Sequence, residues 1–181
     1  MAEIKIININ DIEINDKIYT IFKGKEKNLI SFKAWSFLYN ILKKYNIDLL
    51  QENIIYNEYG KPFLESKKLY FNISHSKNLI AIIISDKDCA IDIQYVNETK
   101  NHDKNIHNIL SESEIIEYKN SDNKNNYFYM LWTKKEAVLK YCGTGINLKQ
   151  LKKINNYNNV KTKLIAQDRE KYYISYIWKW K

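Results

Sequence analysis

The sequence predicts an α+β fold whose two halves meet near residues 85–90. Hydrophobic residues make up 45% of the 181-residue chain and aromatic residues 14%, which is typical of a protein with a packed core. The expected elements follow the order strand, helix, strands, and then helix, helix, strands. No linker rich in proline, glycine or serine is present, and no internal repeat is visible.

The first half begins with partly alternating isoleucines between residues 4 and 14, which predict an opening strand or hairpin. Residues 29–47 place apolar side chains at helical spacing and predict an amphipathic helix. The stretch NEYGKP at 57–62 predicts a turn, since it holds the only proline of the chain and a glycine two residues earlier.

Three short apolar segments at 69–74, 79–84 and 89–93 are rich in β-branched or aromatic residues, and they predict buried strands. Polar loops are expected at 97–108 and 120–126.

The second half carries two helix signals and a final strand signal. Ser111 followed by Glu114 is a capping-box pattern, so a helix is expected to begin near Ser111. A long helix is expected over 127–142 and should end at Gly143. Residues 172–180 predict a last strand, with one side formed by Ile174, Tyr176, Trp178 and Trp180.

The net charge of +8 indicates an anionic partner, and it is concentrated at one end of the chain. Residues 131–181 carry 12 basic and 3 acidic side chains, whereas residues 91–130 carry 4 basic and 7 acidic ones. Arg169 is the only arginine, so the chain lacks the planar forks that read base edges, and no nucleic-acid partner is expected. A solvated lysine face is the simpler interpretation of many of these charges.

Nothing in the composition predicts export or a membrane span. The N-terminal stretch has no basic segment leading into a continuous apolar run, as a signal peptide would. The longest apolar run, at 79–84, is too short to cross a bilayer. We expect a cytoplasmic protein without membrane contact.

One helix face carries a candidate site, because Trp132, Glu136 and Lys140 are spaced four residues apart. A surface Glu–Lys pair worth about 0.3–0.5 kcal/mol is the simpler alternative. Asp92 is a stronger candidate, since a carboxylate between two isoleucines of a strand needs a positive partner, hydrogen bonds or a metal. Gln94 shares its strand face, so the two oxygen-bearing side chains and a helix glutamate suggest a hard-cation site.

The stretch FNISHS at 71–76 is the third candidate. Asn72, Ser74 and Ser76 alternate on one face and His75 points to the other. Such a strand end can bind phosphate through hydroxyl, imidazole and backbone N–H groups. A Ser-His-Asp hydrolase is disfavoured, because Ser74 and His75 point apart and no G-x-S-x-G elbow is present. A strand-end histidine without function is the simplest alternative.

Four motifs occur in a fixed order: EYGKP, FNISHS, AIDIQ, and WTKKEAVLK followed by GTG. Together they resemble the Sfp-type, two-lobed group of 4′-phosphopantetheinyl transferases over residues 58–145, about half of the chain. The resemblance implies two similar α/β lobes in one chain, a pseudo-dimer divided into residues 1–87 and 88–181, with the active site in the cleft between them. It also implies transfer of the phosphopantetheine arm of coenzyme A to a serine of an apo acyl or peptidyl carrier protein, with release of adenosine 3′,5′-bisphosphate, by a Mg²⁺-dependent monomer.

The resemblance assigns roles to particular residues. Asp92 and Glu136 would ligate Mg²⁺, and together with Lys140 they form the expected catalytic set; Lys140 would also contact the pyrophosphate. Lys61 and His75 would neutralise phosphates at the nucleotide end, and Ser74 would add a hydrogen bond. Glu114 matches an acid before the carrier-binding region. The general base is either Glu136 or a water on the metal.

Two departures from the family pattern stand out. Gln94 takes a position where the family has a carboxylate, so weaker or altered metal binding is expected. The usual basic residue at the start of the first long helix has only Lys27 and Lys33 as candidates. An alternative function is therefore a coenzyme A- or carrier-binding homologue with little turnover. A basic nucleic-acid-binding module is a more remote one, because it explains none of the four motifs.

Overall fold

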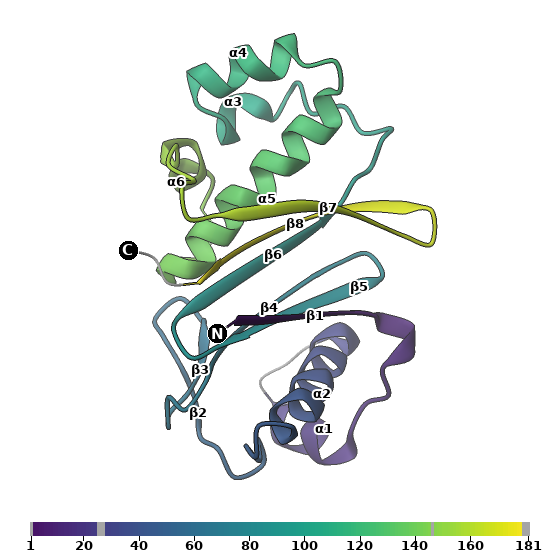
Figure 1. The fold of residues 1–181 in the computed structure, drawn as a ribbon, viewed down its shortest axis with the longest axis vertical. Coiled ribbons are helices and arrows are strands. Elements are labelled where there is room, and N and C mark those ends of the chain that lie inside the picture. The colour runs from purple at the N-terminus through teal and green to yellow at the C-terminus, as the bar shows by residue number, and fades with distance from the viewer. Residues whose placement is uncertain (1, 25–27, 146, 179–181) are drawn as a thin grey trace.

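The computed structural model describes residues 2–24, 28–145 and 147–178, which form four layers. Two three-stranded antiparallel sheets lie face to face in the middle, and helices cover the outer side of each sheet (Figure 1). The predicted α+β class is therefore confirmed. None of the helices in the described ranges is both long and apolar enough to cross a lipid bilayer.

The first sheet has the order β1-β5-β4. Its strands are β1 (Ala2–Asn8), β4 (Tyr70–Ser76) and β5 (Leu79–Ser85). Helices α1 (Asp16–Phe22) and α2 (Leu29–Lys43) cover its outer face, while β2 (Ile54–Tyr56) and β3 (Pro62–Leu64) form a small hairpin beside it (Figure 1).

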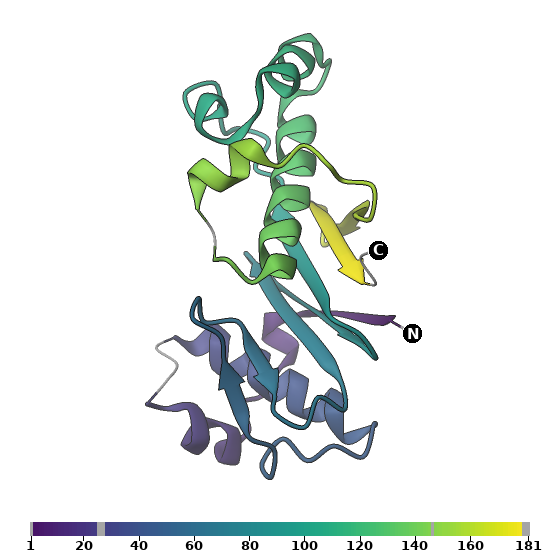
Figure 2. The same cartoon turned by 90° about the vertical axis from the view of Figure 1, so that its left-hand side faces the viewer.

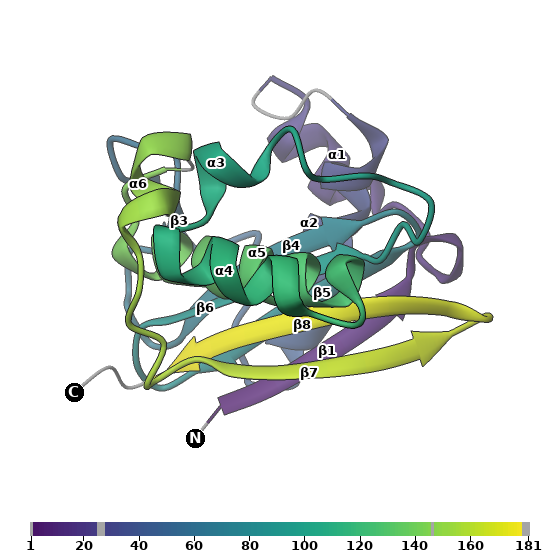
Figure 3. The same cartoon turned by 90° about the horizontal axis from the view of Figure 1, so that it is seen from above.

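The second sheet has the order β6-β8-β7. Its strands are β6 (Cys89–Tyr95), β7 (Lys161–Gln167) and β8 (Glu170–Trp178). The long helix α5 (Lys124–Cys142) crosses its outer face, as Figure 2 shows. Around α5 lie three shorter helices, α3 (Ile106–Ile109), α4 (Glu112–Asn120) and α6 (Leu148–Lys153) (Figure 3).

Strand β5 shows why the segment 79–84 is apolar without interruption. Leu79, Ala81 and Ile83 pack in the layer between the two sheets, and the alternate residues Ile80, Ile82 and Ile84 pack in the core that includes α1 and α2. A strand that is buried on both faces has no polar side to present. The three predicted buried strands correspond to β4, β5 and β6.

The predicted helix ends in the second half are confirmed by their caps. Ser111 caps α4, its Oγ accepting a hydrogen bond from the Glu114 amide at 3.4 Å while Glu114 Oε2 accepts one from the Ser111 amide at 2.7 Å. Gly143 ends α5 in the left-handed conformation, at φ 66°. A side chain at position 143 would be strained, because its Cβ would lie 2.8 Å from Asn57 Nδ2.

Several elements differ from the prediction. The opening strand is correct, but a short 3₁₀ turn, η1 (Ile9–Asp11), and then α1 follow it where a hairpin was an alternative. The elements that the pattern missed are short or weakly periodic: α1, β2, β3, α3, α6 and β7. In β8, Ile174, Tyr176 and Trp178 belong to the same cluster, as expected, whereas Trp180 lies outside the described residues.

Candidate active site

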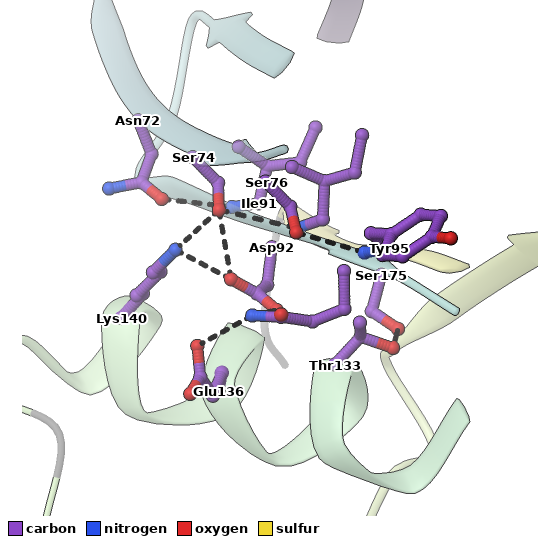
Figure 4. Close-up of polar contacts among 12 residues, drawn as sticks. Asn72, Ser74, Ser76, Ile91, Asp92, Tyr95, Thr133, Glu136, Lys140 and Ser175 are labelled. Atoms are coloured by element: carbon purple, nitrogen blue, oxygen red, sulfur yellow. Dashed lines mark hydrogen bonds and ion pairs between the residues drawn. The ribbon is translucent and has the colours of Figure 1, made fainter. Parts of the chain in front are cut away.

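The candidate site is a polar cluster where β6 meets α5 (Figure 4). Ile91 and Ile93 point into the apolar layer between the sheets, so strand alternation turns Asp92 to the other face, toward α5. Glu136 and Lys140 lie one turn apart on α5 and face Asp92. A further bond at 3.0 Å, from Ser175 Oγ to Thr133 Oγ1, fastens α5 to β8.

One carboxylate oxygen, Asp92 Oδ1, accepts hydrogen bonds from two side chains of the cluster. Asp92 has no exposed surface, and its Oδ1 accepts hydrogen bonds from Lys140 Nζ at 2.7 Å and from Ser74 Oγ at 2.9 Å. Lys140 Nζ also lies 2.8 Å from Ser74 Oγ, which closes a three-membered network. The structure therefore brings together three residues that the sequence named from three separate motifs.

Gln94 lies between the two acids with its amide nitrogen toward both. Nε2 is 3.4 Å from Asp92 Oδ2 and 3.5 Å from Glu136 Oε2, so both bonds are long. The amide thus acts as a donor that bridges two carboxylates. In this arrangement the carbonyl oxygen, which was the expected weak metal ligand, is not the atom that faces the acids.

Burial and charge repulsion act together on Glu136. The side chain is buried, and this burial, followed by the nearby Asp92 charge, raises the pKa of Glu136 to about 8, although Lys140 opposes the shift. Asp92 and Glu136 are thus two adjacent buried carboxylates, and such a pair is a donor set that a hard divalent cation would stabilise. Within the described residues, no three His, Cys, Asp or Glu side chains form a potential metal group, so the set consists of the two carboxylates of Asp92 and Glu136.

The FNISHS side chains join the two sheets, which the sequence did not suggest. Three oxygens of β4 accept hydrogen bonds from backbone N–H groups of β6, each 19 residues further along the chain. The pairs are Asn72 Oδ1 with Ile91 at 3.0 Å, Ser74 Oγ with Ile93 at 3.2 Å, and Ser76 Oγ with Tyr95 at 2.9 Å. We call these contacts the β4–β6 seam (Figure 4). The predicted alternation is correct. In the structure it supplies hydrogen-bond acceptors for backbone N–H groups along the edge of β6 that faces β4.

His75 lies on the opposite side of β4 from the seam. It lines a small pocket with Ser31, Trp35 and Tyr56. Burial, and then the charge of Lys140, lower the pKa of His75, while Asp92 acts in the opposite direction. Ser74 bonds to Asp92 and Lys140, so the described contacts show no Ser74–His75 pair of the kind a hydrolase would use.

Lys61 is nearly buried and holds two parts of the chain together. Its Nζ lies 2.9 Å from Asp88 Oδ1 and 3.3 Å from the carbonyl of Tyr141 near the end of α5. Asn57 adds a bond of 2.7 Å from its Nδ2 to the Gly143 carbonyl. Lys61 also lines a pocket of about 320 Å³ that Lys140 and Asn72 border on another side. Among the described residues, the lining of this pocket includes two lysines and no acidic side chain.

Glu114 belongs to a separate buried network. Its carboxylate pairs with Lys135 Nζ at 2.9 Å and accepts a hydrogen bond from the hydroxyl of Tyr157. Lys135 has no exposed surface and also donates to the carbonyls of Leu151 at 2.9 Å and Ile154 at 2.7 Å. The sequence did not single out Lys135 or Tyr157, because nothing in the pattern distinguishes Lys135 from its neighbour Lys134.

A second pocket, of about 510 Å³, adjoins Gln94 on the side away from Lys61. Aromatic rings of Phe128, Tyr129 and Trp132 form part of its wall. His102 also lines it, stacked on Phe128 with 3.8 Å between ring centroids. Its Nε2 is buried without a hydrogen-bond partner among the described residues, and burial followed by the charge of Lys100 lowers the pKa of His102 to about 4.

Lys27 and Lys33 were the two candidates for the family's basic residue at the start of the first long helix. Lys33 donates from Nζ to the carbonyl of Ile9 at 2.8 Å, a contact within the N-terminal half. Lys27 lies outside the described residues.

Comparison with known proteins identifies the family. Residues 88–179, half of the chain, match the model of the 4′-phosphopantetheinyl transferase superfamily. The chain belongs to this superfamily, and the predicted resemblance is confirmed.

Named relatives agree with this assignment. The chain is 35% identical over 113 residues to 4′-phosphopantetheinyl transferase gsp of Aneurinibacillus migulanus, covering 59% of this chain and 46% of the relative. It is 31% identical over 112 residues to 4′-phosphopantetheinyl transferase Sfp of Bacillus subtilis, covering 60% and 49%. It is 35% identical over 94 residues to 4′-phosphopantetheinyl transferase AcpT of Escherichia coli, covering 50% and 48%. The matches thus span about half the length of these relatives.

Proposed function

We propose that this protein transfers the 4′-phosphopantetheine arm of coenzyme A to a serine of an apo acyl or peptidyl carrier protein, releasing adenosine 3′,5′-bisphosphate. The observation that carries the proposal is the meeting of Asp92, Glu136 and Lys140 between two unlike pockets. Membership of the superfamily supports it.

The two pockets suit the two ends of coenzyme A. The pocket with Lys61 and Lys140 offers positive charge to the phosphates of the nucleotide. The larger pocket, with Trp132 and Phe128 in its wall, suits the neutral arm with its amides and methyl groups. The diphosphate that joins the two ends would then lie at the Asp92–Glu136 cluster, where the bond is broken.

The donor set fits Mg²⁺, which Asp92 and Glu136 would hold. When bound, the ion neutralises the diphosphate charge that builds up as the phosphorus–oxygen bond breaks. Lys140 contacts the same diphosphate and stabilises the leaving adenosine bisphosphate. Ser74 keeps Asp92 oriented through the bond to Oδ1. The proton of the attacking serine passes to Glu136 or to a water molecule beside it.

The remaining parts of the proposal concern architecture and partners. The proposed architecture has two similar lobes, residues 1–87 and 88–181, with coenzyme A bound between them. His75 and Lys61 would come from the first lobe. Carrier proteins are typically acidic, so the +9 charge of residues 131–181 would speed the encounter. Glu114 supports the carrier-binding side by holding α4 against α5. The protein works as a cytoplasmic monomer in this proposal.

The test is incubation of the protein with an apo carrier protein, coenzyme A and Mg²⁺, followed by intact mass measurement. We expect the carrier to gain the mass of one phosphopantetheine. Asp92→Asn removes one charge at constant volume and should abolish the gain, whereas Asp122→Asn makes the same change at an exposed site and should not. Several apo carriers that remain unmodified here, but are modified by a known transferase, would refute the proposal.

A second candidate is a coenzyme A-binding homologue with little turnover. The observation that favours it is Gln94, which presents a donor nitrogen and no third carboxylate to the site. This protein would bind coenzyme A without modifying any carrier, and Gln94→Glu would create activity. Efficient turnover by the native protein decides against it.

A further inference from the structure

In this structure, positive or polar donors hold both oxygens of the Asp92 carboxylate. Lys140 and Ser74 occupy Oδ1, and the Gln94 amide nitrogen faces Oδ2. An ammonium at 2.7 Å occupies the position from which a metal would approach Oδ1. Binding of a cation at Oδ1 of Asp92 therefore competes with Lys140.

The side chain of Lys140 can move into the adjacent pocket, whereas that of Lys61 is anchored. The Lys140 side chain is 19% exposed and lines the pocket that we assign to the nucleotide phosphates. Lys61, in the wall of the same pocket, is 7% exposed and is anchored by Asp88 and the Tyr141 carbonyl. Of these two ammonium groups, Lys140 is the more exposed, and its partner Asp92 is a buried carboxylate that an incoming cation can neutralise in its place.

We propose that Lys140 is the internal counter-ion of Asp92 in the free protein, and that the diphosphate of coenzyme A draws it away so that Asp92 becomes available to a divalent cation. The identity of the anion rests on the proposed function, whereas the competition between Lys140 and the cation rests on the contacts at Asp92 alone. Metal and coenzyme A then bind cooperatively, because each removes an obstacle to the other.

The consequence is a measurable coupling. The factor by which coenzyme A tightens metal binding must equal the factor by which metal tightens coenzyme A binding. With Gln94 in place of an acid, Asp92 and Glu136 carry at most two negative charges, and Lys140 cancels one of them. The free protein should accordingly bind a divalent cation weakly.

The experiment measures Mn²⁺ binding to the full chain without coenzyme A, by electron paramagnetic resonance of free Mn²⁺. Lys140→Met removes the competing ammonium and should tighten Mn²⁺ binding on the order of tenfold, since charge-assisted hydrogen bonds are the strong ones. Lys134→Met makes the same change on the same helix and should leave the affinity unchanged, because Lys134 lines a different pocket, with Glu114 and Tyr157. Asp92→Asn should abolish the binding. Circular dichroism verifies that each variant is folded.

The second arm repeats the titration with saturating coenzyme A. Wild-type affinity for Mn²⁺ should rise, and the rise should be much smaller in Lys140→Met. The proposal is overturned if Lys140→Met and wild type bind Mn²⁺ in the free state within about twofold of each other, or if neither binds it. If the wild-type protein modifies no carrier protein but Lys140→Met still tightens Mn²⁺ binding as expected, the proposed transferase function is refuted and the competition at Asp92 is not.

Discussion

Lys140 Nζ lies 2.7 Å from Asp92 Oδ1, although 48 residues separate the two in the chain. The contact exists because α5 crosses the second sheet above β6 and places the face that carries Glu136 and Lys140 over Asp92. It gives a buried carboxylate a positive partner, which such a group requires. The same contact makes the site dependent on one lysine for charge balance.

Gln94→Glu should strengthen the site for metal and weaken the free protein. A third carboxylate beside Asp92 and Glu136 adds a ligand, so half-maximal carrier modification should need less Mg²⁺. Without metal the added charge is repelled, so the melting temperature should fall and Mg²⁺ should restore it. Gln51→Glu makes the same change at an exposed position and should alter neither quantity. An unchanged Mg²⁺ requirement would show that residue 94 is not a ligand position.

Lys135→Met should be strongly destabilising, by about 3–5 kcal/mol, because it leaves Glu114 buried without its ion-pair partner. Urea unfolding measures the loss. Lys134→Met is the matched control and should cost far less. The double variant Lys135→Met with Glu114→Gln should recover part of the stability, since the uncompensated charge is gone. Additive effects of the two substitutions would contradict a direct coupling.

Ser76→Ala should loosen the β4–β6 seam at one end. The amide of Tyr95 loses the Ser76 Oγ acceptor at 2.9 Å, and the free energy of unfolding should fall by about 1–3 kcal/mol. Hydrogen exchange should accelerate at the Tyr95 amide, while Ser66→Ala, at an exposed turn, should leave it unchanged. Full protection of Tyr95 in Ser76→Ala would mean that another acceptor replaces the hydroxyl.

His102 should make the protein sensitive to mild acid. Its pKa is lowered from 6.5 to about 4, chiefly by burial, with the charge of Lys100 acting in the same direction and that of Asp103 against it. A base with a depressed pKa stabilises the fold above its unfolded pKa and loses that contribution as the pH falls toward its folded pKa. Stability should therefore decline between about pH 6.5 and 4.

His102→Phe removes the titrating group and keeps a ring against Phe128, so the decline over this range should become shallower. Unfolding by urea at several pH values measures the slope. His107→Gln, at an exposed position on α3, is the control and should retain the wild-type slope. Identical slopes for His102→Phe and wild type would place the acid-sensitive group elsewhere.

Local patterns were enough to predict the long helices, the buried strands and the caps at Ser111 and Gly143. Each depends on nearby residues, through the period of a helix or strand or through one capping bond. The elements α1, α3 and α6 escaped because they are too brief for a periodic signal, whereas β7 escaped because none of its residues is buried and it carries no apolar face. Their place depends on packing against α5 or the sheets.

The sequence by itself predicted the α+β class from the order of its elements and the family from the spacing of its motifs, and it named Asp92, Glu136, Lys140 and Ser74 as candidate site residues. Only the tertiary structure decided what the residues do to each other. It paired Lys140 with Asp92, turned the Gln94 nitrogen toward two acids, and distinguished the buried Lys135 from Lys134. The physical reason is that these contacts join β6, α4 and α5 across distant parts of the chain, and local periodicity says which face a side chain takes but not which partner lies opposite it.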